Sequence, residues 1–331
     1  MYLSFDHSKQ SDPDPVFVLR SGTDDITALK YACTVDGKEV IISGSSSGEI
    51  KFWDFSTKRP FLEFQSGSKS GILYVNLLKL SSEWYLITQN REGELLFWNA
   101  SSLSSNMKVK NAWQISKLGF CSISLLEFND SKCWIAFTCG ESSLGVREFP
   151  NDSPGTIELT PKDRKGMVMQ IKLFLSKSNK LLLLSGYEDG CLTIWNVFDA
   201  AALSTLKLYD DPIMALCFDI ESMKVFTGSA GNIVKLVSIN RESLELDLCG
   251  CVSTQYSGCS SAQVRRDGKL LFVGGWDGII RVYTWKKMRL LALLKYHTET
   301  INCMCFNDNN FTIAGCKDGK ISIWDVYSKQ L

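Results

Sequence analysis

One short pattern recurs along the whole chain: an apolar run, a tight turn rich in glycine, a second apolar run and, in most copies, a tryptophan. A clear copy reads Ala314-Gly315-Cys316-Lys317-Asp318-Gly319-Lys320-Ile321-Ser322-Ile323-Trp324-Asp325. Its apolar residues alternate, which is the period of a β-strand with one buried face. The Asp-Gly pair between the two runs supplies the positive backbone dihedral angles of a tight hairpin turn. Each copy therefore predicts two antiparallel strands joined by a short turn.

The spacing of the copies indicates how many such hairpins the chain contains. Weaker copies lie between the clear ones and carry another residue in place of tryptophan. The seven anchor positions are Trp53, Trp98, Arg147, Trp195, Val237, Tyr283 and Trp324. Successive anchors are roughly 41 to 49 residues apart, which is the repeat length of four-stranded WD40 blades. The sequence therefore predicts an all-β fold, a seven-bladed WD40 β-propeller.

An apolar run ahead of each hairpin predicts the first strand of each blade. These runs are Ile26–Tyr31, Ile72–Leu77, Ile123–Phe128, Val168–Phe174, Ile213–Phe218, Ser260–Val264 and Ile301–Phe306. Blade three should find its fourth strand within residues 155–159. The last blade lacks a fourth strand after Trp324, whereas Phe17–Arg20 forms a spare strand near the N-terminus. We expect this N-terminal strand to complete the last blade and close the ring, which removes a free sheet edge.

The repeats leave little of the chain unassigned. Residues 1–15 are expected to form a flexible N-terminal tail, and residues 16–331 a single seven-bladed propeller. The 36 basic and 36 acidic residues balance, which argues against broad binding of nucleic acid or anionic membranes. No apolar run has the length of a membrane span, and the acidic N-terminus does not resemble a secretory signal. We expect a soluble protein of the cytoplasm and nucleus.

One segment resembles a catalytic motif. Gly44-Ser45-Ser46-Ser47-Gly48 matches the G-x-S-x-G motif of serine hydrolases, in which the serine lies between a strand and a helix, near a histidine base. Here the segment stands where other repeats have their hairpin turn, and the chain has only two histidines, His7 and His297. Several of the 12 cysteines fall within predicted strands and none forms a CxxC pair, so a zinc site is not indicated. The sequence predicts no catalytic residue, cofactor or metal site.

His297 has a structural interpretation. It precedes the first strand of the last blade, where WD40 repeats often carry a histidine that hydrogen-bonds with the turn aspartate and the third-strand tryptophan. Asp318 and Trp324 occupy those two positions, but the Ser or Thr that usually joins the network is Ala314. We therefore expect His297, Asp318 and Trp324 to form a partial structural tetrad.

Interaction with other proteins is the function that remains. In a propeller, the turns between second and third strands and the connections between blades open on one face of the ring, the top face. Tyr187 and Trp276 occupy corresponding turns on this face. Exposed aromatic residues are good interface anchors, although each ring could instead pack on a neighbouring blade. Glu92, Glu188 and Asp277 could add an acidic rim.

Several longer strings resemble those of one family. They are Pro13-Asp14-Pro15-x-Phe17-Val18-Leu19-Arg20, Gly186-Tyr187-Glu188-Asp189-Gly190, Gly228-Ser229-Ala230-Gly231, Gly275-Trp276-Asp277, Arg281-Val282 and His297. From about Pro13 to Trp324 the chain is similar to the guanine-nucleotide-binding-protein beta-subunit-like protein 1 family, whose fungal members are called ASTRA-associated protein 1. The resemblance implies a non-enzymatic scaffold that works with the TTT co-chaperone in the maturation of phosphatidylinositol-3-kinase-related kinases. The fungal branch also implies a link to chromatin-remodelling assemblies.

The residues exclude one partner and leave two alternatives to this adaptor role. The segment ahead of the first strand contains Pro13 and Pro15 and no heptad, so we expect no G-protein gamma subunit as a coiled-coil partner. A substrate receptor of a cullin-type ubiquitin ligase often shows Trp-Asp-x-Arg at the end of a blade, and the arginine is missing after Trp53-Asp54 and Trp324-Asp325. A peptide or histone-tail reader with an aromatic and acidic pocket is allowed by the top-face residues.

Overall fold

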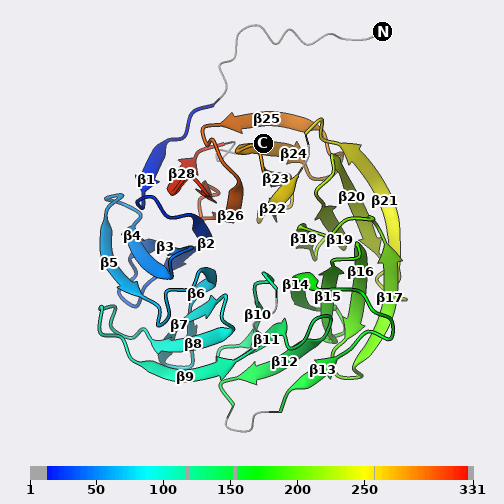
Figure 1. Cartoon of the computed structure of the whole chain (residues 1–331), viewed down its shortest axis with the longest axis horizontal. Coiled ribbons are helices and arrows are strands. Elements are labelled where there is room, and N and C mark those ends of the chain that lie inside the picture. The colour runs from blue at the N-terminus through cyan, green and yellow to red at the C-terminus, as the bar shows by residue number, and fades with distance from the viewer. Residues whose placement is uncertain (1–12, 117–118, 152–154, 257, 327–331) are drawn as a thin grey trace, which may run out of the picture.

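The computed structural model describes residues 13–116, 119–151, 155–256 and 258–326, and these contain β-strands and no helix. In this part of the chain the strands form seven four-stranded antiparallel sheets, arranged as blades around a ring (Figure 1). Six blades consist of four strands that follow one another in the chain, and the seventh combines both ends of it. This confirms the predicted seven-bladed β-propeller.

The blades are numbered in chain order. Within each blade the strands are given from the innermost to the outermost. Blades one and two contain β2 (Ile26–Cys33), β3 (Glu39–Ser45), β4 (Glu49–Asp54), β5 (Pro60–Gln65), β6 (Ile72–Leu80), β7 (Glu83–Asn90), β8 (Glu94–Asn99) and β9 (Val109–Gln114). Blades three and four contain β10 (Ser124–Asn129), β11 (Lys132–Thr138), β12 (Leu144–Phe149), β13 (Ile157–Leu159), β14 (Val168–Leu175), β15 (Leu181–Tyr187), β16 (Cys191–Asn196) and β17 (Ala201–Lys207). Blades five and six contain β18 (Ala215–Asp219), β19 (Lys224–Gly228), β20 (Ile233–Ile239), β21 (Leu246–Ser253), β22 (Cys259–Val264), β23 (Leu270–Gly275), β24 (Ile279–Thr284) and β25 (Leu290–Lys295). Blade seven contains β26 (Ile301–Phe306), β27 (Thr312–Cys316), β28 (Lys320–Trp324) and β1 (Phe17–Arg20).

The turn between the second and third strands requires a backbone conformation that favours glycine. Gly319, between β27 and β28, has a φ of +74°, and a Cβ atom there would lie 2.5 Å from the carbonyl oxygen of Gly22. Gly48, Gly190 and Gly278 also have positive φ in the equivalent turns. The glycine of the repeated pattern is therefore needed for the turn itself.

β1 closes the ring from the other end of the chain, as the sequence predicts. It runs antiparallel to β28, with Leu19 opposite Ile321. The Leu19 side chain is buried in a cluster that also contains Ile26 and Trp53 of blade one. β1 therefore covers the edge of blade seven and also joins that blade to blade one.

The hydrophobic core lies between neighbouring blades. Leu182 and Ile194 of blade four, for example, are buried together with Val225 and Val237 of blade five. A single four-stranded sheet buries its two faces only against its neighbours, so the closed ring is the unit of stability.

Blade three shows what replaces the tryptophan where a repeat lacks it. Arg147 stands at the anchor position of β12, and its guanidinium carbon lies 5.3 Å from the ring centre of Trp113 on β9. The same carbon lies 5.4 Å from the ring centre of Phe137. A cation–π contact between blades two and three thus takes the place of the usual indole packing.

Two other expectations concern less regular parts of the chain. The fourth strand of blade three falls within the predicted interval, as β13. Residues 1–12 of the predicted tail lie outside the described residues. The described part of the chain contains no helix that could cross a membrane.

Candidate protein-interaction surface

Trp276 is a partly exposed aromatic residue in the turn between β23 and β24. Its side chain is 42% exposed, and its indole lies directly against Gly258, where a Cβ atom would come within 2.2 Å of the ring. The Trp276 amide also donates a hydrogen bond to the Gly258 carbonyl oxygen at 3.3 Å. Because Gly258 has no side chain, the indole rests against the backbone and stays accessible on its other side. Such a supported ring loses little conformational entropy on binding.

A second exposed aromatic residue, Tyr256, lies close to the same turn. Arg281 of β24 holds Asp277 through two hydrogen bonds, of 2.6 Å and 3.1 Å, and its guanidinium carbon lies 4.8 Å from the Tyr256 ring centre. The Tyr256 side chain is 53% exposed. We call Tyr256, Trp276, Asp277 and Arg281 the aromatic patch. Tryptophan and tyrosine are among the residues most often found at interface hot spots.

The Arg281–Asp277 ion pair gives the aromatic patch a fixed base. The Arg281 side chain is almost fully buried. Partial burial acts to raise the pKa of Asp277, but the hydrogen bonds and charge of Arg281 outweigh it and hold that pKa below its ordinary value. Asp277 therefore remains ionised and engaged with Arg281 at neutral pH, so it is not a free member of an acidic rim.

Tyr187 is not available at the surface, so the prediction that it is an exposed anchor is wrong. Its exposed fraction is 0%, and the ring lies in a buried cluster with Cys121, Val168 and Leu183. Burial raises the pKa of Tyr187 to about 12. The packing alternative applies here, because Tyr187 is the last residue of β15 and its side chain turns into the space between blades three and four.

The two glutamates of the predicted rim differ from each other. Glu188 is partly buried and accepts a hydrogen bond of 2.9 Å from the Met167 amide. Gly166 lies against it, since a Cβ atom there would be 2.6 Å from a Glu188 carboxylate oxygen. Glu92 is exposed in the turn between β7 and β8 of blade two, whereas the aromatic patch is built on blade six. Glu188 therefore supports a connection between blades, and the structure does not gather the predicted acidic residues into one rim.

The tetrad of blade seven is complete. The His297 Nδ1 atom lies 3.0 Å from an Asp318 carboxylate oxygen, and Nε2 lies 2.7 Å from the Ser322 hydroxyl. The Trp324 indole N–H donates to the same hydroxyl at 2.7 Å. A neutral histidine with its proton on Nδ1 satisfies every bond, because Ser322 then donates to Nε2 and accepts from Trp324.

The hydroxyl of this network comes from an unexpected strand. In blades one, two and four the indole N–H donates to a hydroxyl on the second strand, at Ser43, Thr88 and Ser185. In blade seven that position is Ala314, and Ser322 stands directly opposite it on β28. The expectation of a partial tetrad is therefore corrected: the hydroxyl has moved across the strand pair and still reaches both partners.

The same network makes stability depend on pH. Burial lowers the pKa of His297 below its ordinary 6.5, an effect that Asp318 opposes. The unfolded chain then binds this proton more readily than the folded one, so the His297 contribution is present above pH 6.5 and is lost as the pH falls toward the folded-state pKa. We expect the free energy of unfolding, measured by urea denaturation, to decrease between about pH 7.5 and 5.5. The decrease should be smaller in His297→Gln, and an equal slope in that variant would contradict this role.

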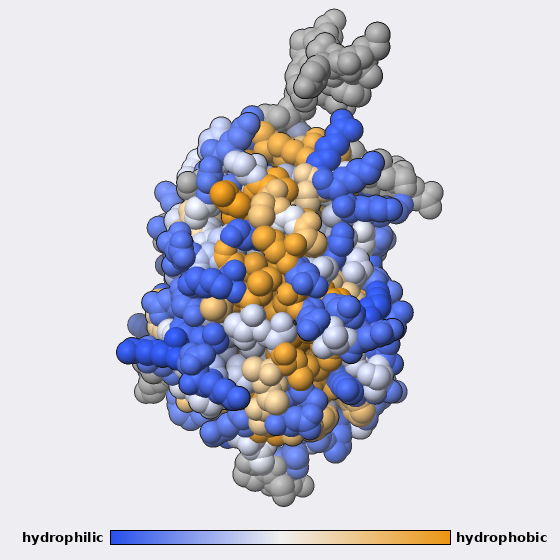
Figure 2. Space-filling model, turned by 90° about the vertical axis from the view of Figure 1, so that its right-hand side faces the viewer, coloured by the Kyte–Doolittle hydropathy of each residue, from blue (hydrophilic) through white to orange (hydrophobic). Residues whose placement is uncertain are grey.

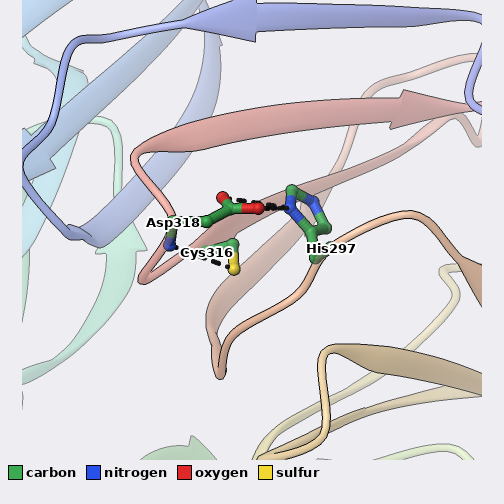
Figure 3. A group of neighbouring side chains, drawn as sticks. All are labelled: His297, Cys316 and Asp318. Carbon is green, nitrogen blue, oxygen red and sulfur yellow. Dashed lines mark hydrogen bonds and ion pairs between the residues drawn. The ribbon is translucent and has the colours of Figure 1, made fainter.

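His297, Cys316 and Asp318 also form a group with metal-like spacing (Figure 3), in which the potential ligand atoms lie within 4.8 Å of one another. Hydrogen bonds already engage the histidine nitrogens and the carboxylate, and the Cys316 thiol donates to the Glu299 carbonyl oxygen at 3.1 Å. Burial raises the pKa of Cys316 to about 12. Metal ligation needs the thiolate, so the tetrad explains this group better than a metal site does.

The serine-rich segment that resembles a hydrolase motif is the turn between β3 and β4. Ser47 donates a hydrogen bond of 2.7 Å to Asp24, and the Ser45 hydroxyl accepts one of 3.1 Å from the Glu49 amide. A hydrolase would also need a histidine base, and the histidine among the described residues, His297, is held in the tetrad. These hydroxyls therefore shape a hairpin turn, as the sequence predicts.

The circumference of the ring offers a different kind of surface. Figure 2 shows an apolar band on the side of the molecule formed by the outer strands of blades four and five. Exposed leucines on these strands are Leu203 on β17 and Leu248 on β21. This band lies apart from the second-to-third-strand turn that carries Trp276, and it provides a matched site for control substitutions.

Comparison with known proteins agrees with this architecture. The family described as WD domain, G-beta repeat matches residues 249–284 and 288–325. A mouse (Mus musculus) protein named Guanine nucleotide-binding protein subunit beta-like protein 1 is 29% identical over 322 residues, covering 95% of this chain and 97% of the relative.

Fungal relatives extend over a similar share of the chain. ASTRA-associated protein 1 of Schizosaccharomyces japonicus is 25% identical, and that of Schizosaccharomyces pombe is 24% identical. Each alignment covers 95% of this chain and 99% of the relative. Proteins of the WD40 repeat class typically act as non-catalytic scaffolds for other proteins. The chain is a seven-bladed β-propeller with WD40 repeats at residues 249–284 and 288–325, and over nearly its whole length it is similar to proteins named Guanine nucleotide-binding protein subunit beta-like protein 1 and ASTRA-associated protein 1.

Proposed function

We propose that this protein is a non-catalytic adaptor that binds protein partners through the aromatic patch. The observation that carries the proposal is the partly exposed Trp276 indole, which Gly258 supports; the next residue, Asp277, pairs with Arg281, whose guanidinium lies against the exposed Tyr256 ring. Partly exposed aromatic rings beside an arginine offer a large contact area at low entropic cost. A rigid propeller holds such a patch without rearrangement.

The proposed partners are the subunits of the TTT co-chaperone and the phosphatidylinositol-3-kinase-related kinases that it helps to mature. Support comes from the family resemblance in the sequence and from relatives whose name states an association with ASTRA. The proposal extends to a link with chromatin-remodelling assemblies and to a location in both cytoplasm and nucleus. It includes no catalytic step, no cofactor and no G-protein gamma subunit.

We expect the double variant Tyr256→Ala/Trp276→Ala to lose its partners while it stays folded. Removal of an aromatic hot-spot residue typically costs about 2–4 kcal/mol of binding free energy, and both side chains leave the interface together. The measurement is quantitative mass spectrometry of partners purified with the tagged full-length protein from its own cells. TTT subunits and the large kinases should be enriched with the native protein and reduced at least ~30-fold with the variant.

A second double variant, Leu203→Ala/Leu248→Ala, is the matched control. It removes two exposed apolar side chains from the circumference of the ring and should keep the partners. Equal recovery with Tyr256→Ala/Trp276→Ala and the native protein would rule out the aromatic patch. Enrichment of cullin-ligase subunits or histones in place of TTT would contradict the proposed partners and favour a substrate receptor or a histone-tail reader.

A further inference from the structure

The centre of the ring contains a cavity that the adaptor function does not use. The first strands of all seven blades line it, and its volume is about 640 Å³. This volume is within the range of small-molecule sites in proteins. Unlike the spaces between blades, which are filled by apolar side chains, the central cavity is lined by charged and amide side chains as well as apolar ones.

Positive charge predominates among the ionisable side chains of the cavity. Lys30 on β2, Lys172 on β14 and Arg266 after β22 line it, together with one carboxylate, Glu127 on β10. Arg266 forms an ion pair with Asp308 outside the cavity lining. The Lys30 and Lys172 ammonium groups make no hydrogen bond or ion pair with any described residue. Two cations from opposite parts of the ring are therefore left without a partner.

Lys30 shows that these charges are held in a confined space. Burial lowers its pKa, Glu127 acts against this change, and the positive charges of Lys172 and Arg266 lower the pKa further. A partly desolvated ammonium that is repelled by two other cations is stabilised by any anion that enters the cavity.

We propose that the central cavity binds a small polyanion that carries two or more phosphate groups. The cations stand on blades one, four and six, so a ligand with several phosphates can contact more of them than a single phosphate can. Charge-assisted hydrogen bonds from lysine and arginine to phosphate oxygens are among the strongest in proteins. The central cavity is separate from the aromatic patch, and anion binding in it does not depend on the adaptor role.

The test is isothermal titration of the full chain with inorganic tripolyphosphate, and with orthophosphate at matched ionic strength. We expect one tripolyphosphate to bind per chain, at least ~10-fold more tightly than orthophosphate, because it reaches more than one cation. The double variant Lys30→Met/Lys172→Met should weaken tripolyphosphate binding at least ~10-fold. Methionine keeps the length and apolar part of each side chain, so the melting temperature of this variant should not fall.

Lys286→Met/Lys287→Met removes the same charge from the exposed turn between β24 and β25, and this control should bind tripolyphosphate like the native protein. Three results would overturn the proposal: no binding of tripolyphosphate to the native protein, equal affinity for orthophosphate, or unchanged affinity in Lys30→Met/Lys172→Met. Equal weakening in both double variants would also overturn it, because the effect would then reflect net charge and not the cavity.

Discussion

Deletion of residues 1–20 is expected to leave the protein insoluble or to lower its melting temperature by about 10 °C or more. The deletion removes β1, which pairs with β28 along four residues and buries Leu19 between blades seven and one. The loss of one buried leucine side chain alone costs about 2–5 kcal/mol, and the deletion also exposes the edge of β28. An uncovered, apolar strand edge promotes aggregation. Thermal melting and the soluble fraction after expression are the measurements.

Two smaller changes distinguish the effect of ring closure on stability from the effect of removing a terminal segment. Deletion of residues 1–12 leaves β1 in place and should melt close to the native protein. Leu19→Ala keeps the strand but removes its buried side chain, and should cost about 3 kcal/mol. A native melting curve for the chain without residues 1–20 would show that β1 does not close the propeller.

Ser322→Ala is expected to destabilise the protein by about 2–4 kcal/mol, although it removes a single oxygen atom. The Ser322 hydroxyl bonds both the His297 ring and the Trp324 indole, and all three side chains are buried. The variant leaves two buried nitrogen atoms without a partner, and each such group costs about 1–3 kcal/mol. Equilibrium denaturation in urea measures the change in the free energy of unfolding.

A second substitution in the same variant provides the control. Ala314→Ser returns a hydroxyl to the position that Ser43, Thr88 and Ser185 occupy in blades one, two and four. Because residue 314 lies directly opposite residue 322, the pair Ala314→Ser/Ser322→Ala should recover most of the lost stability. If Ser322→Ala unfolds like the native protein, the hydroxyl is not the centre of the network.

The fold could be predicted from the sequence because its main determinants are local and repeated. A turn glycine and alternating apolar residues are visible in the chain itself, and seven copies reinforce one another. The start of the first strand agrees with the structure in blades such as the first, at Ile26, and the last, at Ile301. Closure by β1 could be predicted as well, because a blade without a fourth strand requires one from elsewhere.

The candidate site was only partly predictable, as Tyr187 and Trp276 illustrate. Both follow a glycine, but Tyr187 stands three residues before the turn glycine Gly190 and Trp276 only two before Gly278, so Trp276 corresponds to Glu188 and not to Tyr187. Tyr187 is the last residue of β15 and is buried in the space between two blades, whereas Trp276 follows the end of β23 and is partly exposed in the turn, where Gly258 supports its indole. An alignment of the repeats on their turn glycines separates these two residues, whereas the support of Trp276 by Gly258 and the contact of Tyr256 with Arg281 have no signature in the repeat.

The sequence pattern did not reveal the full tetrad, and the reason is different. The repeat position that usually carries the hydroxyl is occupied by Ala314, whereas the strand register places Ser322 directly opposite it. The alternation of apolar residues around Ser322 carries this information, since residues directly opposite on paired strands share a face of the sheet. Register, and not position in the repeat, determines which side chains can replace one another.

The most direct test of the proposed adaptor role is the binding of this protein to purified TTT complex, measured by biolayer interferometry with no other protein present. We expect saturable binding by the native chain, binding at least ~30-fold weaker for Tyr256→Ala/Trp276→Ala, and native affinity for Leu203→Ala/Leu248→Ala. No binding by the native chain would contradict the proposed partner. Native affinity in the aromatic double variant would contradict the proposed site.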